Sequence, residues 1–297
     1  MSVQLDTAVL FMAFNRPATT EKVFDAIRKA KPTKLYLSVD GPRRDVEGEI
    51  AQVEKVQNIV SNIDWPCEVK KLFRKENKGC KNAVSGAISW FFEHEEMGII
   101  LEDDCLPSQS FFPYCSELLE RYKNDLRVAQ ISGFNYGYNN KKLKYDYIFS
   151  KYAMIWGWAT WRDRWEKYSL ELGNLDEVKE SDQLSLLFGR SELARKLRQF
   201  DRVKSGGVDT WDYQWSYMML INNQFTIIPK NNLILNIGFG EDSTHTSGKN
   251  LYERLLLEEI PKIDSHPDYI VQHKRLYRHM SGNTGIFRRF VDLLRSL

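Results

Sequence analysis

Four short strand-like segments in the first hundred residues, separated by amphipathic segments, constrain the fold more than any other feature of the sequence. They predict strands at residues 8–14, 34–39, 67–73 and 97–101, and the apolar segment 8–14 predicts a buried one. The segments between them carry apolar residues at helical spacing and predict helices at residues 19–30, 49–63 and 80–96. Strands that alternate with helices favour an α/β fold with a mostly parallel central sheet and helices on both faces.

Polar residues follow each predicted strand. Arg16 comes after the first strand, Asp40 after the second, Asn77 after the third and the acidic triplet Glu102–Asp104 after the fourth. In open parallel sheets, ligands bind outside the carboxyl ends of the strands. We therefore expect these side chains to converge on one edge of the sheet and to form a ligand site there.

The acidic triplet Glu102–Asp104 is unusual because it directly follows an apolar strand. Like charges repel one another and raise at least one carboxyl pKa unless a cation compensates. Mg²⁺ and Mn²⁺ prefer carboxylate oxygens, water and substrate phosphates. The triplet therefore predicts a divalent metal that bridges to a diphosphate. The alternative is a solvated turn or a helix-capping acid.

Composition narrows the function classes. The formal net charge of +2 over 297 residues gives no strong field that would favour nucleic acid. The four cysteines show no CxxC spacing, which predicts free thiols in a reducing compartment. The N-terminal segment lacks the pattern of a signal peptide, and no apolar stretch approaches the roughly 20 residues of a membrane span. We expect a cytoplasmic protein.

The second half of the chain is less regular and richer in aromatic residues. It predicts further strands near residues 128–136, 147–152 and 225–240, and helices at residues 108–124, 182–204 and 251–260. We expect one domain over residues 1–250 and a helical C-terminal extension over residues 251–297. The tail from Ile286 to Arg295 has the pattern of a short basic amphipathic helix. Such a helix suits an anionic membrane surface; packing on the domain or on a partner subunit is the alternative.

The segment IILEDDCLPSQSFFPY (residues 99–114) resembles the DXD-type motif of nucleotide-sugar glycosyltransferases with the GT-A fold. It is more closely similar to the inverting β-1,2-N-acetylglucosaminyltransferase family that begins complex N-glycans. Three further segments keep that family's motif order, namely WGWATWRDRW (156–165), TWDYQW (210–215) and TIIPKNNLILNIGFGEDSTHT (226–246). The resemblance implies a GT-A fold over about residues 8 to 246.

The resemblance also implies roles for individual acids. Asp104 would bind Mn²⁺ or Mg²⁺, Glu102 would contact the donor sugar, and Asp103 would orient the ribose or metal-bound water. Asp212 would be the general base that removes the acceptor hydroxyl proton. Because the second Trp of TWDYQW lies one residue further along than in the family, Asp209 remains a competing base.

Other positions have both a functional and an ordinary interpretation. The resemblance implies that Arg16 and Asp40 hold the nucleotide, although Asp40 could simply form a turn. Gly79 and Lys81 stand at a predicted helix start, which favours an anion, or Lys81 is a solvated lysine. The remaining two candidates depend on late segments of the chain. Many GT-A enzymes use a late histidine as a metal or diphosphate ligand, a role that would fall to His245, whereas the acetylglucosaminyl family closes a flexible loop there. Trp211 is expected to stack on a sugar ring, whereas Trp156, Trp158 and Trp161 favour the core.

The main hypothesis is a metal-dependent inverting glycosyltransferase that moves a sugar from a nucleotide-diphosphate donor, such as a UDP-sugar, to a glycan or lipid-linked acceptor in surface polysaccharide assembly. A sugar nucleotidyltransferase is disfavoured, because the segment FNRPATT (residues 14–20) lacks the glycine-rich signature expected after the first strand. A third possibility is a degenerate transferase fold that binds glycans or assists assembly without catalysis.

Overall fold

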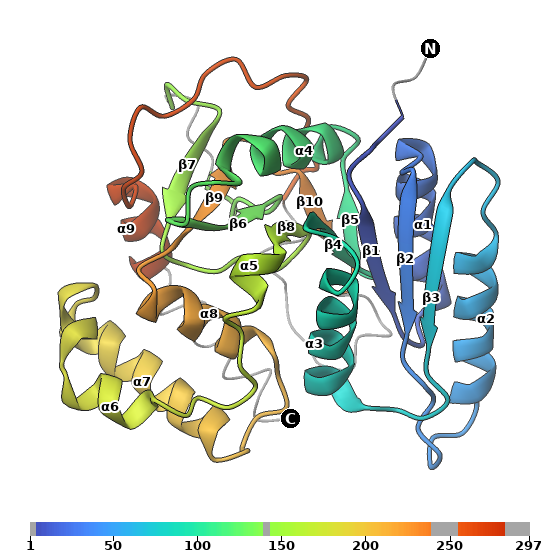
Figure 1. The fold of residues 1–297 in the computed structure, drawn as a ribbon, viewed down its shortest axis with the longest axis horizontal. Helices are drawn as coiled ribbons and strands as arrows, with labels where there is room; N and C mark the ends of the chain where they lie inside the picture. The colour runs from blue at the N-terminus through green and yellow to red at the C-terminus, as the bar shows by residue number, and fades with distance from the viewer. Residues whose placement is uncertain (1–3, 139–142, 239–254, 283–297) are drawn as a thin grey trace.

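An eight-stranded sheet runs through the computed structural model, which describes residues 4–138, 143–238 and 255–282. The strand order is β3-β2-β1-β4-β8-β6-β9-β7 (Figure 1). The strands of this sheet are β1 (Val9–Ala13), β2 (Lys34–Val39), β3 (Glu68–Phe73), β4 (Met97–Glu102), β6 (Val128–Ser132), β7 (Tyr147–Ser150), β8 (Trp158–Trp161) and β9 (Phe225–Pro229). A second sheet pairs β5 (Cys105–Pro107) with β10 (Ile234–Asn236) in antiparallel register.

The first four strands form the parallel half of the sheet, and they match the four predicted strands closely. Val9 of β1 pairs with Leu35 on one side and Ile99 on the other, so β1 is central in this half. Beyond β4 the order changes, because β8 lies antiparallel between β4 and β6. β9 is parallel to β6, and β7 is antiparallel to β9. The predicted α/β fold class with a mostly parallel sheet is confirmed.

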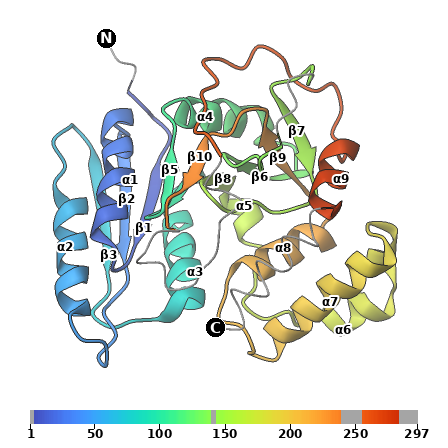
Figure 2. The same cartoon turned by 180° about the vertical axis from the view of Figure 1, so that it is seen from behind.

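Helices cover both faces of the sheet, as Figures 1 and 2 show from opposite sides. One face packs against α1 (Pro17–Ala30), α2 (Glu49–Ser61) and α4 (Phe111–Tyr122). The other face packs against α3 (Gly79–Phe92), α5 (Arg162–Trp165) and α8 (Asp212–Ile221). Strand β1 explains the two layers, because Val9 and Phe11 join the first core while Leu10 and Met12 join the second. Strands buried on both faces are typical of parallel sheets.

The predicted helix at residues 182–204 is divided. A 3₁₀ helix, η1 (Gln183–Leu186), comes first, and the α-helix α7 (Arg190–Lys204) begins after Gly189. Together with α6 (Leu175–Glu180) and α8, α7 encloses a separate small apolar cluster. Figure 1 shows α6 and α7 side by side beneath α8, far from α1 and α2. The last described helix is α9 (Lys274–Gly282).

The predicted helix at residues 251–260 is wrong for residues 255–260, which are not helical. Their polar groups bind other elements instead. The carboxylate of Glu259 accepts the N–H groups of Gln109 (3.1 Å) and Ser110 (2.8 Å) ahead of α4. The N–H of Glu258 donates to the carbonyl of Asn232 at 2.8 Å. The tail from Ile286 and the predicted domain boundary at residue 250 lie outside the described residues.

Across the described residues, no helix combines the length and the apolar character needed to cross a membrane.

Candidate functional site

Arg16 and the acidic triplet meet at the carboxyl ends of β1 and β4, as predicted. The guanidinium of Arg16 is paired with the carboxylate of Asp103, which also accepts the backbone N–H of Phe14 at 3.1 Å. Only 4% of the Asp103 side chain is exposed. Asp103 is therefore held by a cation and a backbone donor at once, which suits a buried charge.

Asp104 is the more accessible acid of this pair. Its Oδ2 accepts Nη1 of Arg16 at 3.0 Å, and 17% of its side chain is exposed. Its Oδ1 accepts the thiol of Cys105 at 3.3 Å. Gly238, which follows β10, lies directly against this ion pair. A Cβ at Gly238 would come within 2.6 Å of Oδ2 of Asp104 and 2.9 Å of Nη1 of Arg16, so any larger residue would displace these side-chain ends.

Two acids of the triplet have a raised pKa. Burial raises the pKa of Glu102 to about 8, and the charges of Asp104 and Asp103 add to the rise against the opposing charge of Arg16. Burial likewise raises the pKa of Asp103 to about 6, although Arg16 opposes the rise. The carboxyls of Glu102 and Asp103 therefore titrate as a coupled pair near neutral pH. Arg16 supplies the compensating cation that sequence reasoning assigned to a metal alone.

Asp212 and Asp209 approach the triplet from the start of α8. Asp212 is in the first turn of that helix, where the helix dipole favours an acid, and it accepts the hydroxyl of Thr210. It lies close enough to Glu102 for its charge to raise the pKa of that carboxyl. Asp209 is exposed and faces the start of α3, because a Cβ at Gly79 would lie 3.0 Å from its Oδ2.

Cys80, which the sequence analysis did not single out, lies among the candidate acids. Burial raises the pKa of its thiol to about 12, and the charges of Glu102, Asp209, Asp212 and Asp40 add to the rise. The Cys80 thiol is thus close enough to acids from the ends of β2 and β4 and from the start of α8 for their charges to raise its pKa. Its position directly after Gly79, at the predicted helix start, was the available signal.

Two backbone donors at the start of α3 are already used within the protein, and anion binding at this turn stays a prediction. The N–H of Lys78 donates to both carboxylate oxygens of Asp40, at 3.2 and 3.0 Å, and the N–H of Gly79 donates to Oδ1 of Asn77 at 3.1 Å. These donors are used because the loops after β2 and β3 pack tightly. At Gly41 a Cβ would come within 2.4 Å of the Glu76 backbone.

Asp40 is therefore 7% exposed and holds the start of α3, and burial raises the pKa of its carboxyl. Two contacts connect the loop after β2 to the loop after β3. The carboxylate of Asp40 accepts the N–H of Lys78, and the carbonyl of Gly41 accepts Nδ2 of Asn77 at 2.9 Å. Lys81 is half-buried in the first turn of α3, and its carbonyl accepts the hydroxyl of Ser85 at 2.6 Å. A nucleotide role for Asp40 or Lys81 stays a prediction.

Glu49 was also missed and connects two loops at this edge. Its side chain is 2% exposed. It accepts Nδ2 of Asn15 at 2.8 Å and the backbone N–H of Arg43 at 2.6 Å. It therefore fixes the loop that precedes Arg16. The available signal was an acid at the first position of a predicted helix.

The expectation that Trp211 stacks on a sugar is wrong for this structure. The residue is 2% exposed, and its ring stacks on that of Trp158 with centroids 5.7 Å apart and planes 17° apart. Trp165 packs against both rings. The predicted core role of Trp158 is confirmed by its complete burial. Trp158 and Trp165 thus cover the ring of Trp211, and neither of its faces is exposed to a ligand.

The donor set for a metal is small. Within residues 4–138, 143–238 and 255–282, no three His, Cys, Asp or Glu side chains are arranged to hold a metal ion. The candidate ligand His245 lies outside the described residues. The partly exposed carboxylate of Asp104 fits a magnesium or manganese ion that takes one or two protein carboxylates and completes its shell with water and phosphate.

Comparisons with known proteins give distant structural likenesses. No protein-family model and no curated protein matches the chain. The chain is similar to S. aureus TarS 1–349, with 9% identity and a TM-score of 0.41 over 77% of this chain and 59% of that chain. It is similar to UDP-glucose pyrophosphorylase complexed with UDP-glucose, with 9% identity and a TM-score of 0.38 over 76% and 90% of the two chains. It is also similar to the glycosyltransferase GlyE of Streptococcus pneumoniae TIGR4, with 10% identity and a TM-score of 0.37 over 75% of this chain and 45% of that chain. Likenesses of this size assign the chain to no family.

Proposed function

We propose that the chain is a metal-dependent inverting glycosyltransferase that uses a nucleotide-diphosphate sugar, such as a UDP-sugar. The observation that carries the proposal is the convergence of Asp212 with the strand-end triplet, close enough for its charge to raise the pKa of Glu102. These are the acids to which the motif order assigns the base and the donor site. The convergence supports the assignment because the two segments are more than a hundred residues apart in sequence.

Asp104 would hold Mn²⁺ or Mg²⁺ together with phosphate oxygens of the donor. The ion would stabilise the charge that develops on the leaving diphosphate. Arg16 pairs with Asp104 and would also contact a donor phosphate, because its side chain is 37% exposed. Asp103 is fully engaged and would keep Arg16 in place rather than contact the donor.

Asp212 would take the proton from the acceptor hydroxyl as that oxygen attacks the anomeric carbon. Glu102 would bind a donor-sugar hydroxyl, and at neutral pH its raised pKa lets it donate as well as accept. Asp209 remains the competing base, because it faces the same α3 start that Cys80 occupies. Inversion follows if the base and the leaving diphosphate lie on opposite sides of the sugar ring.

The acceptor proposed is a glycan or a lipid-linked sugar of surface polysaccharide assembly. The cell site proposed is the cytoplasm, with the basic tail from Ile286 against the inner face of the membrane. Co-sedimentation with phosphatidylglycerol vesicles tests the tail. Binding that survives deletion of residues 283–297 would contradict its role.

A thermal-shift screen with UDP-, GDP-, CMP- and dTDP-sugars, with and without Mn²⁺, tests the function. We expect one nucleotide class to stabilise the protein and Mn²⁺ to increase the shift. The Asp104→Ala variant should lose the Mn²⁺-dependent part of the thermal shift, and the wild-type protein should hydrolyse the selected donor slowly.

If no nucleotide sugar binds with metal present, the proposal fails. Full cellular function of Asp212→Asn would instead favour a glycan-binding or assembly protein.

A further inference from the structure

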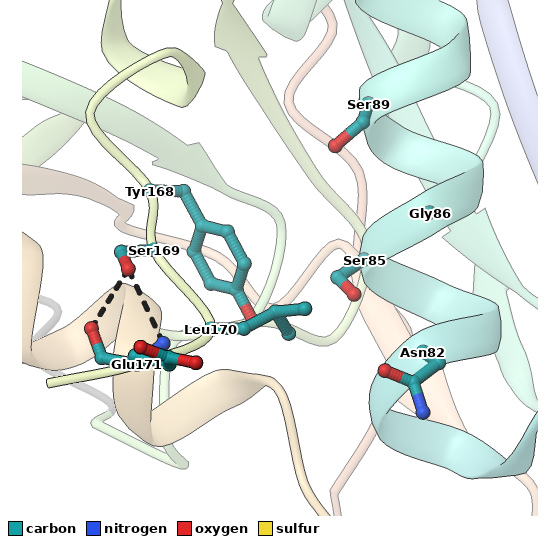
Figure 3. Close-up of a pocket in the computed structure, with 8 residues that line it drawn as sticks. All are labelled: Asn82, Ser85, Gly86, Ser89, Tyr168, Ser169, Leu170 and Glu171. Carbon is teal, nitrogen blue, oxygen red and sulfur yellow. Dashed lines mark hydrogen bonds between the residues drawn. The ribbon is translucent and has the colours of Figure 1, made fainter.

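A cavity of about 460 Å³ lies beside the candidate acids and belongs to none of the roles above. We call it the Tyr168 pocket. Its residues come from α3 and from the loop after α5, namely Asn82, Ser85, Gly86, Ser89, Tyr168, Ser169, Leu170 and Glu171 (Figure 3). The volume falls within the roughly 300–1,000 Å³ of small-molecule sites.

The lining of the Tyr168 pocket selects a neutral, hydroxyl-rich ligand. It presents serine hydroxyls, one amide, a tyrosine and one carboxylate, and it includes no lysine, arginine or histidine. An anionic nucleotide diphosphate would find no cation there to pair with its charge. A sugar ring, by contrast, offers several hydroxyl groups that can donate to and accept from such a lining.

Several of these polar groups are held in place by the protein while keeping capacity for a ligand. The exposed hydroxyl of Ser89 accepts Nε1 of Trp165 at 3.0 Å, so its own hydrogen can be donated. The hydroxyl of Ser169 donates to the carbonyl of Glu171 at 2.7 Å and accepts its N–H at 3.2 Å. This turn fixes the rim of the pocket (Figure 3).

Tyr168 connects the pocket to the candidate base. Its ring stacks on Trp165, with centroids 4.3 Å apart and planes 9° apart, and its hydroxyl donates to the carbonyl of Trp211 at 3.1 Å. Trp211 is the residue before Asp212. Burial, and then the charge of Asp212, raise the pKa of the Tyr168 hydroxyl, in agreement with this proximity. In Figure 3 the hydroxyl points toward Ser85 of α3.

We propose that the Tyr168 pocket binds a sugar ring of the acceptor, next to the start of α8 that carries Asp212. That the ligand is an acceptor rests on the proposed function. That it is a sugar rests on the polar, uncharged-to-acidic lining of the pocket. The donor's anionic part would remain with Arg16 and Asp104.

Saturation-transfer difference NMR on the full chain tests the proposal. The probes are methyl β-glucoside, methyl β-galactoside and methyl N-acetyl-β-glucosaminide, with UDP plus Mn²⁺ measured separately. Ser89→Trp places a large side chain in the pocket from an exposed helix position. Ser61→Trp is the matched control, because Ser61 is also an exposed helical serine whose hydroxyl accepts one hydrogen bond, from Lys71 at 3.0 Å.

We expect at least one glycoside to give a signal with wild type and Ser61→Trp, and that signal to be lost in Ser89→Trp while UDP binding is kept. Glu171→Trp, on the exposed loop, should give the same loss and serves if Ser89→Trp does not fold. No glycoside signal with wild type, or a signal that persists in the folded variants, overturns the proposal. Glycoside binding in the pocket, with no binding of any of the four nucleotide sugars in the thermal-shift screen, would keep the sugar site and remove the proposed function.

Discussion

Nη1 of Arg16 donates to Oδ2 of Asp104 across 3.0 Å, while the same guanidinium is paired with Asp103. The acidic triplet at the end of β4 is therefore tolerated in part because a cation from the end of β1 lies within it. We propose that the same cation also meets an incoming phosphate.

Replacing Arg16 should expose the repulsion within the triplet. We expect Arg16→Ala to lower the free energy of unfolding by about 2 kcal/mol, less than for a wholly buried pair because Arg16 is 37% exposed. Mn²⁺ should restore stability more in this variant than in wild type, as measured by urea unfolding. Arg127→Ala, which removes the exposed pair with Asp125 at 2.7 Å, should cost about 0–1 kcal/mol. Equal losses in the two variants would contradict the role of Arg16.

A methyl group at Gly238 should disturb the pair of Arg16 and Asp104. In Gly238→Ala the new Cβ would lie 2.6 Å from Oδ2 of Asp104, so either the ion pair or the backbone must move. We expect donor affinity to fall about tenfold, equivalent to about 1.4 kcal/mol. Gly173→Ala is the control, since no heavy atom lies within 4 Å of its added Cβ. Calorimetric titration with the donor found in the screen measures both variants.

The two candidate bases make different predictions. Asp212→Asn should lower kcat for transfer by about 10²–10⁴-fold, the usual contribution of a general base, with donor affinity unchanged. Asp209→Asn should change kcat only a few-fold, because that carboxylate is exposed beside Gly79. If Asp209→Asn shows the larger loss in kcat, the two roles are exchanged.

Trp211 should matter for stability rather than for sugar binding. Its ring is buried between Trp158 and Trp165, so Trp211→Ala should lower the free energy of unfolding by about 3–5 kcal/mol. Denaturant unfolding measures this loss. The donor affinity of the folded variant should stay near that of wild type. Weakened sugar binding at unchanged stability would show instead that the ring reaches a ligand.

Replacing the buried Lys196 should increase stability by an amount that depends on pH. Burial lowers the pKa of its ammonium to about 8, partly opposed by Glu192, and its Nζ lies 5.1 Å from the Tyr152 ring. The folded protein thus releases this proton at a lower pH than the unfolded chain does. The cost of the buried charge is therefore complete below about pH 8 and falls as pH rises toward the ordinary lysine value.

Lys196→Met should accordingly raise the free energy of unfolding by about 2 kcal/mol at neutral pH and by less at about pH 10. Urea unfolding at the two pH values measures the difference. Lys179→Met, which removes a surface ammonium paired with Asp201 at 2.8 Å, should change little at either pH. A gain for Lys196→Met that does not shrink with pH would contradict the interpretation.

The parallel half of the sheet was predictable because its signals are local. β1, β2 and β4 are short, largely apolar runs, β3 is a short charged strand at the edge of the sheet, and each intervening helix has its own periodicity. The same local order predicted that Arg16 and the triplet would meet. By contrast, residues 255–260 have a helical pattern in the sequence but are not helical in the structure. Glu259 instead accepts the N–H groups of Gln109 and Ser110, which lie about 150 residues earlier in the chain, and no local pattern can predict such a contact.

The sequence by itself determined the α/β alternation and the position of the acids at strand ends, because periodicity and chain order carry that information. The pairing of the triplet with Asp212 came from the family resemblance instead. The tertiary structure alone decided which groups are already used. Arg16 enters the triplet, Asp40 and Asn77 accept the N–H groups of Lys78 and Gly79, and Trp211 is buried by Trp158. Each of these depends on the packing of side chains from distant segments, and packing is set by the whole fold rather than by any local pattern.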